Sequence, residues 1–235
     1  MKHVSLSLLL VVVFALPSAS LAQESPFDFA FRAGLNLSYL SFDKGEVPGK
    51  RIKPGVNVGL AANYHTSESL FLQTALTFTT KGARIRGDVP LGFEGVVVDG
   101  RTTKPELMSQ QMYVQVPLHI GYKIPLTPGK KLTVQAGPYA AYGVAGKTRL
   151  TADVLYGDYI DDTPMEEKTF GSRGLQKLDY GAGAGIGLDL GSTIISLNYE
   201  LGLRNIAPTG ITYIPFYHDT SYKNRNLCLQ VDIRF

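Results

Sequence analysis

The chain of 235 residues has no tryptophan, one cysteine and a formal charge of only +3 at pH 7. The lone cysteine, Cys228, excludes an intramolecular disulfide. So small a charge carries no polyelectrolyte signal, and we expect no nucleic-acid partner. Beyond residue 22 no apolar run approaches the ~20 residues of a membrane-spanning helix, which excludes helical spans from that part of the sequence.

Motifs of catalysis and ligand binding are lacking as well. His119 has no serine or carboxylate motif beside it, and a lone histidine is more often structural than catalytic. The alternating glycines Gly181, Gly183, Gly185 and Gly187 lack the strand-to-helix setting of a phosphate loop. On the inner face of a narrow barrel they would let the sheet bend sharply or admit bulky side chains from opposite strands. The acidic residues 157–162 lack EF-hand spacing. We therefore expect no enzyme activity, no cofactor and no metal site.

The N-terminal residues have the pattern of a secretory signal. Lys2 and His3 precede an apolar run over residues 6–16, and small residues end at Ala22. This predicts a signal peptide over residues 1–22, cleaved between Ala22 and Gln23, with an uncleaved anchor helix as the alternative. Residues 23–235 then form one domain.

Eight segments of that domain alternate apolar and other residues with a period of two, which predicts strands with one apolar face. They cover residues 29–42, 55–65, 70–79, 112–123, 132–146, 179–190, 195–204 and 226–235. Ten residues suit a tilted strand crossing a bilayer, and a last strand that ends on an aromatic residue, here Phe235, is characteristic of bacterial outer-membrane barrels. Pro117 interrupts the fourth segment, where a missing ladder donor predicts a bulge.

The connections alternate strictly between short and long. The short ones are residues 66–69, 125–131 and 191–193, and the long ones are residues 43–53, 82–111, 147–178 and 206–225. This alternation is typical of short periplasmic turns and long extracellular loops. We therefore predict an all-β, eight-stranded antiparallel up-and-down transmembrane barrel in a Gram-negative outer membrane, with both termini in the periplasm.

A soluble barrel such as a lipocalin would instead place the apolar faces inside. Tyrosines at the ends of those faces favour contact with the lipid bilayer, because aromatic girdles flank the apolar band of membrane barrels. They are Tyr39, Tyr64, Tyr122, Tyr142 and Tyr199.

The opposite faces send charged residues into a narrow lumen. The first, seventh and eighth strands are neighbours in a closed barrel, so we expect one ion-pair cluster of Arg32, Glu200, Arg204, Asp232 and Arg234. A gate or proton path is the alternative, but eight strands leave room for little beyond side chains, which favours a packed plug. We expect the barrel-assembly machinery to recognise the C-terminal strand through Phe235.

The long connections differ in charge. The first two are basic, with Lys44, Lys50, Arg51 and Lys53, then Arg84, Arg86, Arg101 and Lys104; the third is acidic, with Asp153, Asp158, Asp161, Asp162, Glu166 and Glu167. Pairing between loops, or simple solvation, is the simpler interpretation. The functional interpretation assigns the basic loops to lipopolysaccharide phosphates and the acidic loop to a divalent cation or a partner.

Several short motifs occur in order along the chain: FLQTALTFTTKG at 71–82, YVQVPL at 113–118, AGPY at 136–139, LDYG at 178–181 and YELGLRNI at 199–206. Together with the terminal strand they resemble the Bacteroidetes outer-membrane β-barrel family typified by the PorT protein, a small barrel of the OmpA/OmpX type. The resemblance implies a fold and a location; a proline at the place of Pro117 recurs in that family, and PorT itself is linked to protein export.

We therefore predict a surface or structural barrel whose loops contact lipopolysaccharide, envelope proteins or external ligands. A PorT-like accessory of protein secretion and a narrow porin are the alternatives. An envelope enzyme that uses His119 ranks last.

Overall fold

The computed structural model describes residues 25–42, 50–86, 106–151, 154–156, 159–161, 164–171, 174–208 and 221–235. The predicted cleavage site between Ala22 and Gln23 lies outside these residues. Lys44, Arg101 and Lys104 of the basic loops and Asp153, Asp158 and Asp162 of the acidic loop also lie outside them. None of the described residues belongs to a helix long and apolar enough to span a membrane.

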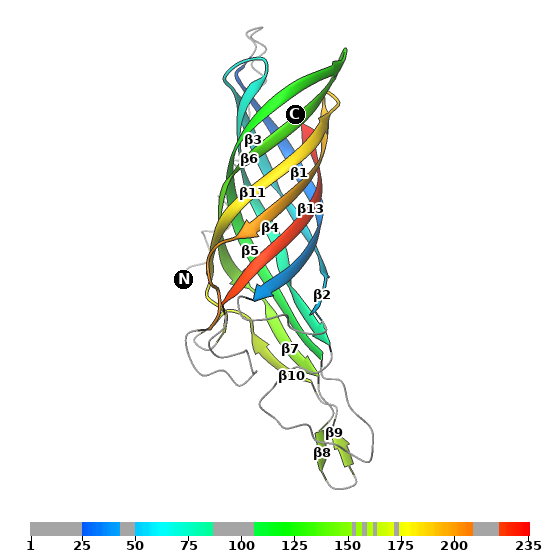
Figure 1. The fold of residues 1–235 in the computed structure, drawn as a ribbon, viewed down its shortest axis with the longest axis vertical. Coiled ribbons are helices and arrows are strands. Elements are labelled where there is room, and N and C mark those ends of the chain that lie inside the picture. Colours follow the sequence, from blue (N-terminus) through cyan, green and yellow to red (C-terminus); the bar gives the residue numbers. More distant parts are fainter. Residues whose placement is uncertain are drawn as a thin grey trace, which may run out of the picture.

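Eight strands form a closed antiparallel ring, which confirms the predicted barrel (Figure 1). Around the ring they are β1 (Phe27–Phe42), β3 (Lys53–His65), β4 (Leu70–Arg86), β5 (Glu106–Thr127), β6 (Lys130–Ala145), β11 (Leu178–Asp189), β12 (Thr193–Gly202) and β13 (Tyr222–Arg234). The last strand closes the ring on the first, in a register from Ala30↔Arg234 to Phe42↔Tyr222. Each strand pairs with the ring strands before and after it in sequence, so the topology is up-and-down.

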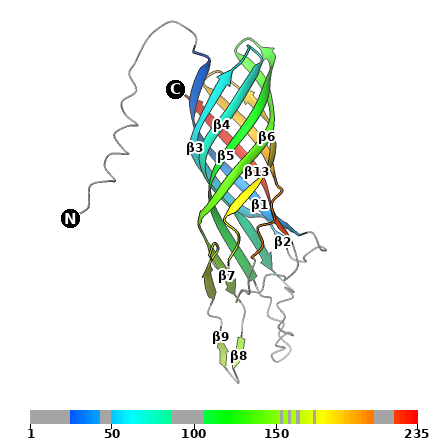
Figure 2. The ribbon, with the colours of Figure 1, turned by 90° about the vertical axis from the view of Figure 1, so that its left-hand side faces the viewer.

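Strand pairing continues past one end of the ring. β4 and β5 pair as far as Arg86↔Glu106, inside the predicted loop 82–111. Five short strands lie at the same end: β2 (Lys50–Arg51), β7 (Lys147–Thr151), β8 (Val154–Tyr156), β9 (Tyr159–Asp161) and β10 (Met165–Lys168). β2, β4, β5, β7 and β10 form what we call the loop-end sheet, and the separate β8–β9 hairpin projects beyond it (Figures 1 and 2). The prediction that residues 82–111 and 147–178 are loops throughout was therefore wrong.

Pro117 lies in β5 without a bulge. The register with β6 is the same at Val116↔Ala140, Pro117↔Tyr139 and Ile120↔Ala136. The two irregularities of β5 fall between Met112 and Tyr113 and between Pro125 and Thr127 instead. Thr74 Oγ1 donates a hydrogen bond of 2.9 Å to the Pro117 carbonyl. The predicted bulge is therefore wrong, because the missing N–H removes one ladder donor without changing the register.

Apolar side chains cover the outside of the ring and polar ones fill it. Phe31, Leu76 and Ile120 are 59–60% exposed, whereas the inward Asn36 and Gln73 are 1% and 3% exposed. This arrangement is the reverse of a soluble barrel and suits a lipid-facing outer surface.

Exposed aromatic residues lie at both ends of the apolar surface. At the end with the short turns, the turn end, ring centroids lie 4.8 Å apart in both Phe27–Tyr64 and Phe31–Phe235. Towards the other end, the loop end, the exposed tyrosines are Tyr39, Tyr142, Tyr180 and Tyr199. Such girdles mark the two interfaces of a transmembrane barrel.

Candidate functional site: the polar lumen and the loop end

The lumen is narrow enough that glycines must make room for larger side chains. An ideal Cβ on Gly183 of β11 would lie 3.1 Å from His119 Nε2, and one on Gly185 would overlap the Asn198 side-chain oxygen. The inward glycines of β11 therefore accommodate side chains of β5 and β12. The sequence predicts room for side chains of opposite strands, but these side chains come from the adjacent β12 and from β5, two strands away in the ring.

Arg32 and Asp232 form a bidentate ion pair in the lumen. Arg32 Nε and Nη2 donate to the two carboxylate oxygens of Asp232 at 2.8 and 2.7 Å, and both residues are buried. Arg32 Nη2 also donates to Gln73 Oε1 at 2.8 Å, and Gln73 Nε2 donates to Asn63 Oδ1 at 2.8 Å. Bidentate charge-assisted bonds of this kind are the strong and geometrically specific ones.

A second ion pair crosses the lumen nearer the loop end. Lys81 Nζ lies 2.8 Å from Glu200 Oε2, and Lys81 is fully buried. The ammonium also lies 4.5 Å from the ring centroid of Tyr139, a cation–π contact. Glu200 accepts from Gln115 Nε2 at 2.5 Å and from Asn226 Nδ2 at 3.0 Å.

A third group lies at the turn end. Arg234 binds both carboxylate oxygens of Asp189 at 3.0 and 2.8 Å, and Lys123 Nζ lies 3.7 Å from the same carboxylate. Arg234 Nε is also 3.4 Å from Asp28 Oδ2, which His65 Nε2 contacts at 2.6 Å. This end of the lumen is therefore occupied by alternating charges.

The expected single cluster is thus three separate groups, and the prediction was wrong on this point. Strand stagger is the reason: Glu200 pairs in register with Asn226, six residues from Asp232 and so about 20 Å away along the strand. Arg204 belongs to none of the groups. Its Nη2 donates to Gln176 Oε1 at 2.9 Å, and its guanidinium carbon lies 5.8 Å from the Tyr180 ring centroid.

The buried charges of the described lumen occur next to charges of the opposite sign. Arg32 pairs with Asp232, Lys81 pairs with Glu200, and Arg234 and Lys123 lie beside Asp189. A pore that selects ions by charge needs an excess of one sign, whereas this arrangement neutralises itself internally.

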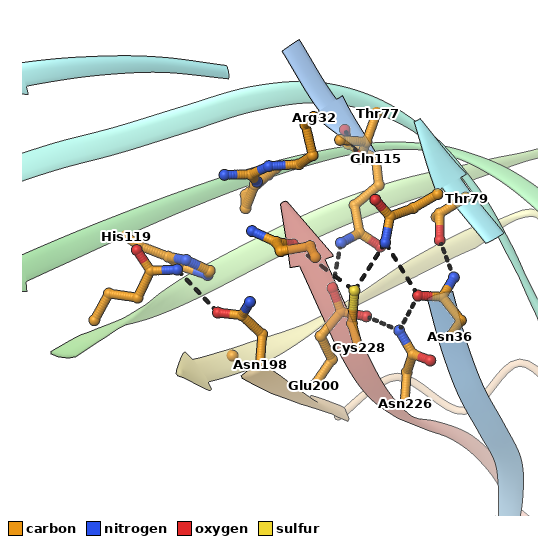
Figure 3. A pocket seen from close by; sticks show the side chains of 15 residues that line it. Arg32, Asn36, Thr77, Thr79, Gln115, His119, Asn198, Glu200, Asn226 and Cys228 are labelled. Atoms are coloured by element: carbon orange, nitrogen blue, oxygen red, sulfur yellow. Dashed lines mark hydrogen bonds between the residues drawn. The ribbon is translucent and has the colours of Figure 1, made fainter. Parts of the chain in front are cut away.

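A polar cavity of about 30 Å³, room for about two water molecules, lies in the lumen and is lined by Arg32 and Glu200 among others (Figure 3). Asn57 Nδ2 lies 2.8 Å from the buried Cys228 Sγ in its wall. Three amide oxygens and one imidazole nitrogen of its lining lack a protein hydrogen-bond partner: Asn57 Oδ1, Gln115 Oε1, Asn226 Oδ1 and His119 Nδ1. Nowhere in the described part of the chain do three histidine, cysteine or carboxylate side chains gather into a metal-binding group.

An apolar cluster closes the loop end of the lumen. It consists of Leu40, Ala83, Tyr113, Tyr139, Ala141, Phe170, Leu175, Ile206, Ala207 and Tyr222, and we call it the plug. Phe170 and Leu175 come from the segment after β10, and the Leu175 N–H donates to the Thr169 carbonyl at 2.7 Å. The Phe170 ring covers Gly143, where an ideal Cβ would lie 2.5 Å from Phe170 Cζ. Neither the segment after β10 nor residues 206–207, which follow β12, was recognised from the sequence as part of the lumen.

The outer face of the loop-end sheet carries a row of cations. The register places Arg51 opposite Arg84, Arg84 opposite Met108, and Met108 opposite Arg149. A hydrogen bond from Arg84, together with the nearby guanidinium groups of Arg86 and Arg51, holds the pKa of Glu106 below its ordinary value.

A second carboxylate in the same sheet lies opposite Arg149. Glu166 is hydrogen-bonded by Arg149 and by Lys147, and these bonds lower its pKa in the same way. Each of the two carboxylates therefore has more than one cationic neighbour.

The ring, its lipid-facing surface and its filled lumen define a small outer-membrane β-barrel. The chain matches the model of the family described as outer membrane protein beta-barrel domain over residues 21–207, and it belongs to this family. Comparison with curated proteins finds no match.

Among solved structures the chain is similar to Ail, the attachment invasion locus protein of Yersinia pestis, in complex with the heparin analogue sucrose octasulfate. The identity is 14%, the TM-score is 0.39, and the match covers 89% of this chain and 99% of Ail. It is also similar to Neisserial surface protein A, with 14% identity, a TM-score of 0.37 and coverage of 88% and 97%. OprG of Pseudomonas aeruginosa shows 11% identity, a TM-score of 0.37 and coverage of 90% and 97%.

Proposed function

We propose that this protein is a closed barrel that carries a structured interaction surface outside the cell, rather than a pore or an enzyme. The observation that supports this most is the successive closure of the lumen. Four groups fill the lumen one after another from the turn end to the loop end. They are the turn-end charges, the Arg32–Asp232 pair, the Lys81–Glu200 pair and the apolar plug. Solute passage would require several charge pairs to separate inside a low-dielectric interior, which is costly.

Planar-bilayer recording tests the closed lumen directly. The folded wild-type barrel should show no stable open state, and Phe170→Ala/Leu175→Ala should show none either, because both buried ion pairs remain. Leu35→Ala, on the lipid-facing surface, is the matched control. A stable solute-permeable state of the wild type would replace this proposal with the narrow porin.

The orientation is the second part of the proposal. The loop-end sheet would lie outside the cell and both termini in the periplasm, as the short turns at the opposite end support. In a Cys228→Ser background, Lys147→Cys should react with a membrane-impermeant maleimide on intact cells. Lys130→Cys, at the β5–β6 turn, should react only after lysis. The reverse result would invert the orientation.

A PorT-like accessory role in secretion is the second candidate, and the ordered motifs that resemble the Bacteroidetes family favour it. The barrel would then hold the loop-end sheet outside the membrane, where envelope or secretion proteins could contact it. Crosslinking at Lys147 in intact cells, followed by pull-down, should recover a secretion component under this alternative. Recovery of lipopolysaccharide alone would count against it.

A further inference from the structure

The loop end carries cations at two levels above the apolar band. The lower level lies at the aromatic girdle: Lys177 Nζ is 5.8 Å from the Tyr142 ring centroid, and Arg204 lies at the same distance from Tyr180. Arg225 is opposite Tyr39 in the register. Basic side chains next to girdle tyrosines lie at the depth of lipid headgroups.

The upper level is the outer face of the loop-end sheet. Its register with the girdle is given by β5, where Val114 is opposite Tyr142 and Met108 is opposite Arg84 and Arg149. Six residues of strand separate the two levels, about 20 Å along β5. At the tilt of about 40° usual in these barrels, the upper level lies about 15 Å farther from the membrane.

Among the described side chains of this upper face, cations exceed carboxylates. The cations are Arg51, Arg84, Arg86, Lys147 and Arg149, and the two facing carboxylates are Glu106 and Glu166. The side chains of Arg84, Arg86, Lys147 and Arg149 are 45–75% exposed. Pairing among the described side chains therefore leaves an excess of positive charge that faces outward, close to the membrane.

We propose that the two levels together bind an outer-leaflet glycolipid that carries anionic groups both at its headgroup and on its sugars. The lower level would contact the headgroup phosphates, and the upper level would contact phosphates on the core sugars about 15 Å above them. A phospholipid has no anion at the upper height. The proposal rests on the orientation proposed above but not on the closed lumen.

The test uses the full mature barrel in detergent and three fluorescently labelled glycolipids. They are lipid A alone, a glycolipid with a phosphorylated inner core, and the same glycolipid after phosphatase treatment of its core. The variant is Arg84→Gln/Arg149→Gln. It leaves each carboxylate of the face with a cationic partner, because Glu106 retains its ion pair with Arg86 and Glu166 retains its ion pair with Lys147. Lys130→Gln/Lys131→Gln, which removes the same charge at the opposite end, is the control.

Each basic residue near an anionic surface is worth about fivefold in binding. Arg84→Gln/Arg149→Gln should therefore weaken binding of the phosphorylated-core glycolipid about 25-fold, with lipid A unchanged and the control pair without effect. Glu106→Gln should strengthen binding several-fold. The proposal would be overturned if Arg84→Gln/Arg149→Gln weakened the binding of lipid A to the same extent, or if the control pair weakened glycolipid binding equally. Complete displacement of the glycolipid by a soluble sulfated polysaccharide would also overturn it. Surface labelling at Lys147 separates such a failure from a wrong orientation.

Discussion

The Lys81–Glu200 pair should be worth more to the barrel than any other single contact across its lumen. Lys81 lies in β4 and Glu200 in β12, which are four strands apart in a ring of eight, so the pair connects opposite walls. Glu200→Ala removes the carboxylate and leaves a fully buried ammonium without its 2.8 Å partner. The change also removes Glu200 as the acceptor for the amides of Gln115 and Asn226, of which Asn226 keeps a longer bond of 3.4 Å to Asn36 Oδ1.

Breaking a buried ion pair on one side costs about 3–5 kcal/mol, because an uncompensated charge stays in a low-dielectric interior. We expect Glu200→Ala to lower the free energy of unfolding by that amount. Lys81→Met should cost less, about 1–3 kcal/mol, since Glu200 keeps two amide donors. The double variant Lys81→Met/Glu200→Ala should be more stable than Glu200→Ala alone, because it buries no unpaired ammonium.

Urea unfolding in lipid vesicles, followed by the heat-modifiable migration of the folded barrel, measures these differences as a double-mutant cycle. Gln230→Ala, in the wall of the same cavity, is the control and should cost under about 1.5 kcal/mol. Planar-bilayer recording of Glu200→Ala should show no large new conductance, since Arg32–Asp232 and the plug remain. Unchanged stability together with a large conductance would refute the reasoning and identify the pair as a gate.

Three further predictions concern the two ends of the barrel. Gly143→Ala would place a methyl group 2.5 Å from Phe170 Cζ and should cost about 1–3 kcal/mol by overpacking, seen as a lower urea midpoint; an unchanged midpoint would show that the plug withdraws freely. Deletion of Phe235, whose ring lies 4.8 Å from Phe31, should lower the yield of assembled barrel in cells far more than the stability of the refolded protein; normal assembly would refute recognition of this residue. Because the pKa of Glu106 is depressed in the folded state, its contribution to the loop-end sheet is complete above the unfolded value of about 4.3 and is lost as pH falls through the folded pKa. The protection of the amides of residues 84–86, measured as exchange relative to the intrinsic rate at each pH, should therefore fall at acid pH in the wild type, and Glu106→Gln should abolish that dependence; identical pH profiles would contradict it.

The sequence pattern predicted the strands correctly within the bilayer, where lipid requires outward apolar residues. It did not predict how far the strands extend beyond the bilayer. Within the membrane, outward residues must be apolar, so period-two alternation identified all eight ring strands. In β4 beyond the girdle the pattern inverts: Ala83 and Ile85 face inward, whereas Arg84 and Arg86 face outward. A search for outward apolar faces therefore ends the strand too early.

Lumenal contacts between adjacent strands were easier to predict than contacts across the lumen. Arg32 and Asp232 are directly opposite in register once β1 pairs with β13, and barrel closure alone brings them together. Lys81 reaches Glu200 only through the relative stagger of strands on opposite walls. That stagger depends on the shear of the whole ring, which no local pattern specifies.

The paired charges also explain how a filled lumen helps to determine the fold. A slip of two residues between β1 and β13 would keep every apolar side chain outward, so the lipid face alone does not distinguish the registers. Slipping one way would place Arg32 opposite Arg234, and slipping the other way would place it opposite Gln230; in both cases Asp232 would be opposite an uncharged residue, either Gly34 or Ala30. Either slip buries unpaired charge, which costs several kcal/mol. The lumenal ion pairs therefore select one register among those that the membrane would accept, and this structural role accounts for their burial without a transported substrate.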